Sequence, residues 1–227
     1  MPQRTEWLQR VAIFSDLDAP SLAGLAALFK ERSFEKDALV VGQQDPGDSL
    51  YVVTGGRVKV VLYGTSGREI ILSLFRPGDF FGEMSLLDNQ PRSANVLAVE
   101  RSQMLVLDRK SFAKHLAENP KTALNVLAEL SKRLRRADAI IGNLALLDVY
   151  GRVARFLREL ARAEGNETAE GIVIAKRPTQ VEIAAMIGTS RETVSRALSE
   201  FARRGFIDME GKRLVMRHGF QNEPDEA

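Results

Sequence analysis

The stretch FFGEMSLLDNQPRSANV, residues 80–96, decides how this 227-residue chain is interpreted. Its glycine, Gly82, lets the backbone approach a ligand closely, because no side chain stands in the way. The carboxylate of Glu83 can accept a hydrogen bond from a sugar hydroxyl. A short apolar helical turn from Met84 would aim free backbone N–H groups at an anion. The stretch therefore predicts a turn that holds a sugar and a phosphate.

Two further residues of the stretch strengthen this prediction. Nine residues after the glutamate, Arg92 supplies a planar fork of donors that matches a phosphate, and Ser93 adds a hydroxyl group. A 3′,5′-cyclic nucleotide carries one negative phosphate and a free ribose 2′-hydroxyl, so one arginine and one carboxylate at this separation suit it. On these residues alone, the alternative is a surface loop with an ordinary pair of Glu83 and Arg92.

The composition is that of a globular protein with room for two domains. Hydrophobic residues make up 44% of the chain and charged residues 27%. The absence of cysteine excludes disulfides, thiolate catalysis and cysteine-ligated zinc or iron–sulfur clusters. The two histidines, His115 and His218, lie far apart in the sequence. We therefore expect no metal site, and a structural or solvated role for each histidine.

Charge and hydropathy indicate where the protein acts. Residues 175–219 contain nine Lys or Arg against five Asp or Glu, although the net charge of the chain is only +2. Such a local surplus is typical of a nucleic-acid-binding domain. Residues 1–10 lack the apolar run of a signal peptide, and no later run approaches the length of a membrane span. We therefore expect a cytoplasmic protein without a membrane partner.

Residues 34–107 have the pattern of a β domain. Short apolar runs alternate with turns rich in Gly, Pro and Asp, which predicts an antiparallel jelly roll. The predicted strands are residues 39–41, 50–53, 58–62, 70–74, 94–98 and 103–107. Before them, apolar positions at helical spacing over residues 7–29 predict a short helical lead-in.

A family resemblance becomes specific within this β domain. The segments GDSLYVVTGG (residues 47–56), FGEMSL (81–86) and RSANV (92–96) together resemble the cyclic-nucleotide-binding domain. The resemblance assigns the ribose hydroxyl to Glu83. The residues that it implies for the cyclic phosphate are Gly82, Arg92, Ser93 and Ala94.

A long helix is predicted after the β domain. Asn119 is expected as its N-cap and Pro120 as its first residue. Its apolar residues recur at alternating spacings of four and three, a heptad seam that predicts a two-stranded coiled coil and hence a homodimer. The seam consists of Ala123, Leu127, Leu130, Leu134, Ala137, Ile141 and Leu144. The alternative is that this stripe packs only against the β domain.

Residues 178–198 predict a helix-turn-helix. Thr179 is expected as the N-cap of the first helix, with Glu182 completing a capping box. Gly188 falls in the turn, and Ser190 is expected as the N-cap of the second helix. The residues expected in the small core are Val181, Ile183, Ile187, Val194, Leu198 and Phe201.

The second helix of this motif presents side chains suited to base edges. Arginine can bind O6 and N7 of guanine, and glutamate can accept from the N4 amine of cytosine. The residues expected to face outward early in this helix are Arg191, Glu192, Thr193, Ser195 and Arg196. Residues 206–216 then predict a two-stranded wing, with Lys212 and Arg213 near phosphates. For the second helix, the alternative is that its Arg and Glu residues form only a solvated charged face.

These segments together resemble the CRP/FNR superfamily of bacterial transcription regulators. The segment GNLALLDVYGR, residues 142–152, resembles the family's hinge, and Asp148 would cap the next helix. The resemblance implies a homodimer on double-stranded DNA with palindromic half-sites like TGTGA. It also implies RNA polymerase as a partner, because a loop in the place of residues 164–171 can touch it in the family. The implied DNA contacts are Thr179, Gln180, Ser190, Arg191, Glu192, Thr193, Arg196 and Lys212.

The base-binding positions depart from the family's pattern. In the best-known member a Thr-Ser pair on the long helix contacts adenine, one residue from each subunit, and the matching positions are Ala137 and Asp138. Asp138 can still accept a hydrogen bond from an exocyclic amine, and Arg133 lies one turn before Ala137. We expect cAMP as the effector, with cyclic di-GMP or ligand-independent DNA binding as the alternative.

Two other classes of function fit less well. A nucleotide hydrolase could use Glu83 as its base, but no nucleophile–base pair or second catalytic carboxylate accompanies it. A sensor that acts only through protein contacts would not bind duplex DNA. The expected α+β architecture is an N-terminal antiparallel jelly roll over residues 1–118, a dimerisation helix over 119–147 and a winged helix-turn-helix over 148–227. An acidic tail is expected from residue 222.

Overall fold

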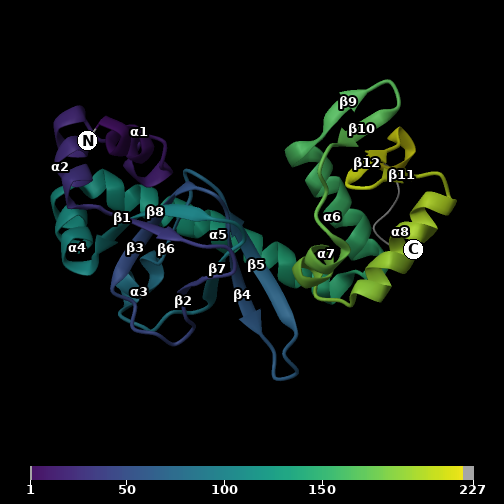
Figure 1. The fold of residues 1–227 in the computed structure, drawn as a ribbon, viewed down its shortest axis with the longest axis horizontal. Coiled ribbons are helices and arrows are strands. Elements are labelled where there is room, and N and C mark those ends of the chain that lie inside the picture. Colours follow the sequence, from purple (N-terminus) through teal and green to yellow (C-terminus); the bar gives the residue numbers. More distant parts are fainter. Residues whose placement is uncertain (1, 222–227) are drawn as a thin grey trace. The chain divides into compact units, whose positions relative to one another are not determined.

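The computed structural model describes residues 2–221 of the chain. The predicted acidic tail, residues 222–227, lies outside the described residues. The chain divides into two compact units, Met1–Arg135 and Arg136–Ala227 (Figure 1). Helix α5 (Pro120–Leu146) contributes residues to both units.

The first unit is built on two four-stranded antiparallel sheets. One sheet has the order β1-β8-β3-β6, and the other has the order β2-β7-β4-β5. The strands are β1 (Lys30–Phe34), β2 (Leu39–Val41), β3 (Ser49–Gly55), β4 (Val58–Tyr63), β5 (Glu69–Phe75), β6 (Phe80–Phe81), β7 (Asn95–Ala98) and β8 (Ser102–Asp108). The predicted antiparallel β fold and its six predicted strands are confirmed.

The sequence did not predict strands β1 and β6, and the reasons differ. β1 carries the polar sequence KERSF and lies at the edge of its sheet, where it pairs only with β8 and leaves four of its residues exposed. β6 consists of Phe80 and Phe81 alone, which pair with Val52 and Tyr51. Neither strand has both the length and the alternation by which a strand is recognised in sequence.

Strand β3 is buried on both faces and organises the first unit. Leu50 and Val52 belong to a core formed with the helices of this unit. Tyr51 and Val53 belong to a second core, formed between the two sheets. Since successive side chains of a strand point to opposite faces, β3 lies between the two cores.

The helices of the first unit cover the outer face of the sheet that contains β3. Asp18 and Asp108 cap α2 and α4, each accepting a hydrogen bond from the backbone N–H three residues later. Their apolar residues fill the core that they share with β3. The helical segments here are α1 (Pro2–Gln9), the 3-10 turn η1 (Ala12–Phe14), α2 (Ala19–Leu28), α3 (Glu83–Asp88) and α4 (Arg109–Glu118).

His115 has a structural role where α4 meets α5. Its side chain is buried, and its Nε2 lies 3.1 Å from the Thr122 hydroxyl oxygen. Its ring meets the ring of Phe14 edge-on, with 5.8 Å between centroids. Burial lowers the pKa of His115 below its ordinary value, which favours the neutral ring. The expectation of a structural role is confirmed for this histidine.

Helix α5 begins at Pro120, as predicted, and has 27 residues. Thr122 and Val126 are buried on the face that packs on the first unit. The side-chain amide of Asn119 donates to the carbonyl oxygen of His115 at 3.0 Å. Between residues 2 and 221, no helix, α5 included, is both long enough and apolar enough to span a bilayer.

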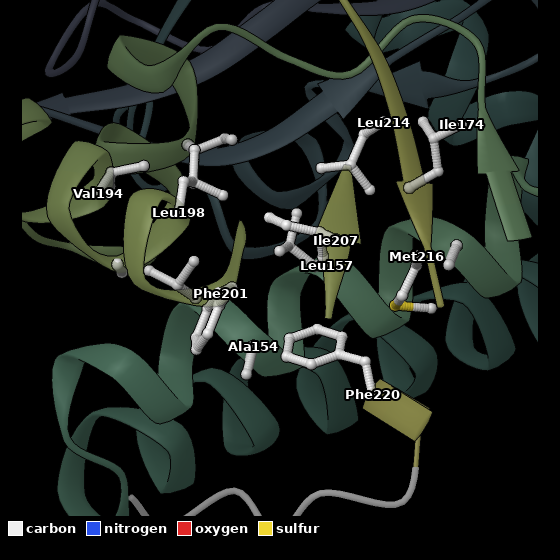
Figure 2. Packing of buried hydrophobic residues seen from close by; sticks show 14 of the residues in the cluster. Ala154, Leu157, Ile174, Val194, Leu198, Phe201, Ile207, Leu214, Met216 and Phe220 are labelled. Atoms are coloured by element: carbon white, nitrogen blue, oxygen red, sulfur yellow. The ribbon is translucent and has the colours of Figure 1, made fainter. Parts of the chain in front are cut away.

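The second unit is a winged helix-turn-helix, as predicted. Helices α6 (Val149–Glu164), α7 (Gln180–Ile187) and α8 (Arg191–Arg203) accompany a four-stranded sheet of order β11-β12-β10-β9. Leu157 of α6, Leu198 of α8 and Ile207 of β11 lie in one core (Figure 2). The remaining segments are β9 (Asn166–Thr168), β10 (Gly171–Ile174), β11 (Ile207–Glu210), β12 (Arg213–Met216) and the 3-10 turn η2 (His218–Gln221).

Two predictions for the second unit were wrong. Residues 164–171 are not a loop throughout, because β9 pairs with β10 in a hairpin. All three residues of β9 are polar and exposed, so no apolar alternation marked the strand. Val181 does not belong to the core, since its side chain is 60% exposed. Ile183 and Ile187 define the inner face of α7, and Val181 lies outside it.

Truncation of Leu157 should destabilise the second unit. The side chain is fully buried, so Leu157→Ala should lower the free energy of unfolding by about 2–5 kcal/mol. Amide hydrogen exchange over residues 149–216 measures the loss. Leu146→Ala is the matched control, because that side chain is 79% exposed. Equal protection in the two variants would contradict the core described above.

Candidate functional site

The turn between β6 and α3 requires a glycine. Gly82 precedes α3 with φ +89°, in the left-handed region. A Cβ atom there would lie 2.6 Å from Nη1 of Arg92 and 2.7 Å from the carbonyl oxygen of Ser49. Close approach and backbone conformation both exclude a side chain at this position, and the predicted turn at Gly82 is confirmed.

The guanidinium of Arg92 is buried in this turn. Nη1 donates to the Gly82 carbonyl at 2.9 Å, and Nη2 donates to the Ser49 carbonyl at 2.7 Å. Its Cζ lies 5.8 Å from the ring centroid of Tyr51. Nε is buried and has no hydrogen-bond partner within the described part of the chain. Burial lowers the pKa of Arg92 below its ordinary value, so a bound anion would relieve a desolvated charge.

Glu83 is the complementary group on the other side of the turn. Its side chain is 1% exposed, and Oε1 accepts a hydrogen bond from Nη1 of Arg133 at 2.8 Å. Oε2 is buried and has no partner among residues 2–221. Burial raises the pKa of Glu83, and the nearby charge of Arg133 opposes that rise. The free oxygen is therefore an acceptor that a ligand hydroxyl can satisfy.

Arg133 connects this pair to the long helix. It projects from α5 and donates through Nη2 to the carbonyl oxygen of Phe80 at 2.6 Å. Its Cζ lies 4.7 Å from the ring centroid of Phe80 and 5.1 Å from that of Phe75. Two aromatic rings, a carbonyl and a carboxylate thus fix one guanidinium.

Arg109 is a functional candidate that sequence reasoning missed. It is the first residue of α4, and its guanidinium donates to the carbonyl oxygens of Gly47, Ser85 and Leu86. These bonds tie α3 to the loop before β3. Its charge also lowers the pKa of Arg92. Only the preceding Asp108, an N-cap residue, marks this position in the sequence.

The other predicted ligand residues differ in burial. Ala94 is buried, whereas Met84 and Ser93 are exposed. Ala137 and Asp138 belong to the second unit and are exposed. Hydrogen bonds join Arg92 to Gly82 and Arg133 to the adjacent residue, Glu83. Within residues 2–221, no group of three or more His, Asp or Glu residues is placed to hold a metal ion.

The helix-turn-helix has the predicted caps. Thr179 and Glu182 form a reciprocal capping box, with Glu182 N–H donating to the Thr179 hydroxyl and Thr179 N–H donating to the carboxylate at 2.7 Å. Gly188 ends α7 with φ +70°, and the Ser190 hydroxyl accepts from Thr193 N–H at 3.2 Å. These caps fix the start of α8.

A basic surface surrounds the start of α8. Arg191, Glu192 and Arg196 are exposed, and Arg196 donates to the Thr193 hydroxyl at 3.4 Å. A cavity of about 310 Å³ opens beside them. Its lining residues are Arg177, Pro178, Thr179, Gln180, Val181, Arg191 and Lys212. Three cations on one cavity suit a phosphate backbone next to base edges.

Arg177 is a second residue that the sequence prediction left out. Its backbone N–H donates to the carbonyl oxygen of Lys212 at 2.9 Å, and its guanidinium donates to the carbonyl oxygen of Gly211 at 3.3 Å. Gly211 is the turn of the wing, with φ +57°. Arg177 therefore holds the wing beside the first helix of the motif. Its position before Pro178 gave no sign of this role.

An apolar stripe on α5 is exposed. Leu134 and Ile141 are 63% and 64% exposed, and Leu127 and Leu144 are exposed as well. Leu130 alone of the predicted seam leucines packs partly on the first unit's core. The alternative that this stripe packs only against the β domain is therefore wrong.

Family models match both units. A model of the cyclic nucleotide-binding domain matches residues 31–119, and a model of the Crp-like helix-turn-helix domain matches residues 151–218. The first match contains the turn with Glu83 and Arg92, and the second contains α7, α8 and the wing.

Similar proteins cover nearly the whole chain. A CRP-like cAMP-activated global transcriptional regulator of Mycobacterium tuberculosis is 34% identical over 93% of this chain and 94% of its own length. A cyclic AMP receptor protein of Thermus thermophilus is 37% identical over 83% of this chain and 85% of its own length. Among solved structures, the c-di-GMP responsive global regulator CLP of Xanthomonas campestris has a TM-score of 0.76 and 25% identity, covering 88% of this chain and 99% of that one.

A methyl group at Gly82 should disrupt the turn. Gly82→Ala places an atom against Arg92 and Ser49 at positive φ, so it should lower the free energy of unfolding by about 1–3 kcal/mol. Urea denaturation followed by fluorescence of Trp7, the single tryptophan, monitors the first unit.

Gly67→Ala is the matched control for Gly82→Ala. Gly67 also has positive φ, but a Cβ there meets nothing within 4 Å. It shares the conformational strain and lacks the clash. If both variants lose the same stability, the close packing of the turn contributes nothing.

Proposed function

Because the chain belongs to the CRP/FNR family of transcription regulators, we propose that it is a homodimer that binds cAMP. The dimer with bound cAMP would then bind palindromic DNA with TGTGA-like half-sites. The chain is a cyclic-nucleotide-responsive DNA-binding regulator and not an enzyme. The observation that carries the ligand proposal is the pair of buried, unsatisfied atoms, Nε of Arg92 and Oε2 of Glu83.

The chemistry of these atoms fits a cyclic nucleotide. A cyclic phosphate would meet the Arg92 guanidinium, and the ribose 2′-hydroxyl would donate to Oε2 of Glu83. Gly82 lets the backbone approach Arg92 and Ser49 closely, and Ala94 offers a small buried neighbour. Ser93 and Met84 complete the proposed contacts to the phosphate side of the ligand.

Residues of the long helix α5 would distinguish among cyclic nucleotides by contacting the base. Asp138 can accept a hydrogen bond from the exocyclic amine of adenine, and Ala137 leaves space for a ring. Two relatives bear names that state cAMP, which supports adenine. Cyclic di-GMP is the second candidate, because a structural neighbour with 25% identity is named as responsive to it.

The exposed apolar stripe on α5 supports the proposed homodimer. Leaving Leu127, Leu134, Ile141 and Leu144 in water is unfavourable, and a second copy of α5 would cover them at heptad spacing. A homodimer would also present two copies of α8, as a palindrome requires. We propose RNA polymerase as a further partner, at the exposed strand β9.

Loss of the Arg92 guanidinium should impair nucleotide binding. Titration calorimetry of the whole chain with cAMP, cGMP and cyclic di-GMP should give the tightest binding for cAMP. Arg92→Ala should weaken it by about 1.5–3 kcal/mol, since a charge-assisted hydrogen bond is lost. Arg101→Ala is the control, because that side chain is 72% exposed. Unchanged binding by Arg92→Ala would refute the site.

Two substitutions separate base contacts from backbone contacts on DNA. Arg191→Ala should cost about 1–3 kcal/mol on the cognate site and relax the preference for its guanine. Lys212→Ala should weaken binding to all sequences alike and lower the salt slope by about one. Anisotropy of labelled duplexes at several salt concentrations measures both effects.

Arg162, which is exposed on α6, provides a control for the loss of one positive charge in these DNA experiments. Arg162→Ala removes the same charge outside the recognition helix and the wing, so it should leave sequence preference intact. A uniform loss for Arg191→Ala across all duplexes would make Arg191 a phosphate contact.

A further inference from the structure

The flanks of the α5 seam carry one charged pair. With Leu127, Leu134 and Ile141 at heptad position a, Leu130, Ala137 and Leu144 take position d. The flanking positions e and g within α5 are then Leu124, Val126, Ser131, Arg133, Asp138, Ile140 and Ala145. Arg133, at g, and Asp138, at e, are the charged residues among them, and their charges are opposite.

The spacing of this pair fits a parallel dimer. In two parallel helices, a residue at g faces the residue at e five positions further along the partner helix, where interhelical ion pairs form. Residues 133 and 138 differ by five. An antiparallel arrangement would instead set g against g and e against e, so it could not pair Arg133 with Asp138. The charge pattern therefore favours the parallel pairing of two copies of this chain.

Both side chains are available for such a pair. Asp138 is exposed, and within the described part of the chain its side chain has no hydrogen bond or ion pair. Arg133 uses one donor on Nη1 for Glu83 and one on Nη2 for Phe80. A guanidinium has five N–H donors, so three remain for a second carboxylate.

We propose that Asp138 of the partner subunit forms an ion pair with Arg133. Each ligand site is then linked to the opposite chain by three residues in contact, Glu83, Arg133 and the partner's Asp138, which we call the relay. This inference rests on the proposed homodimer and deepens it. The ligand would act on one end of the relay, because a ribose hydroxyl on Oε2 of Glu83 takes up part of that carboxylate's negative charge. Arg133 is then held less by Glu83 and more by the partner helix.

The relay predicts that nucleotide binding and dimerisation favour each other. Linkage requires the effect to be reciprocal: if the nucleotide tightens the dimer, the dimer tightens the nucleotide by the same factor. It also gives Asp138 a purpose that does not involve the base. A base contact would act only when ligand is present, whereas the ion pair acts in the ligand-free dimer too.

Sedimentation equilibrium of the full-length, ligand-free protein tests the relay. Asp138→Asn should raise the dimer dissociation constant about fivefold, from two half-exposed ion pairs per dimer, and lower the sensitivity of dimerisation to salt. Asp138→Glu should retain the wild-type constant. Glu129→Gln is the control: it removes a carboxylate of α5 that pairs with Lys132 on the same helix and lies at position c, away from the seam.

A double-mutant cycle identifies the partner of Asp138. In an Arg133→Gln background, Asp138→Asn should have no further effect on the dimer, because the pair is already broken. A wild-type dimer whose ligand-free dissociation constant is unchanged by Asp138→Asn would overturn the relay and leave the proposed function standing. A wild-type chain that stays monomeric would overturn the relay and the homodimer together.

Discussion

The structure depends on two opposite charges that are withdrawn from water beside one glycine turn. Arg92 has carbonyl oxygens rather than a carboxylate as its hydrogen-bond partners, and Glu83 keeps one oxygen unsatisfied. Burying such groups is unfavourable unless a partner arrives. An anion with a neighbouring hydroxyl satisfies both, which is why a phosphate joined to a sugar suits the site better than either group alone.

The surroundings of these charges explain the rest of the first unit. Strand β3 supplies the Ser49 carbonyl and the Tyr51 ring, and its burial between two cores keeps both in place. Arg109 holds α3 against the preceding loop. Through Arg133, the same site reaches α5, the helix that carries the exposed apolar stripe. In the proposed dimer, ligand chemistry and subunit contact would therefore meet on a single side chain, Arg133.

The sequence predicted those parts of the fold in which local chemistry decides the outcome. The capping box at Thr179, the turn at Gly82 and the helix start at Pro120 depend on residues a few positions apart, and each was found. β1 and β9 were missed because polar edge strands show no apolar alternation. Arg109 and Arg177 were missed because their partners are backbone carbonyls of distant or turn residues, which carry no side-chain signal. The exposure of Val181 likewise depends on tertiary packing.

We propose that filling the Glu83–Arg92 site changes how well the chain binds DNA. The most direct measurement is the affinity for a duplex with two TGTGA-like half-sites, followed by anisotropy as the cAMP concentration rises at fixed salt. We expect a saturable gain in affinity that disappears when the half-sites are scrambled. An affinity for the duplex that is the same with and without any cyclic nucleotide would contradict it.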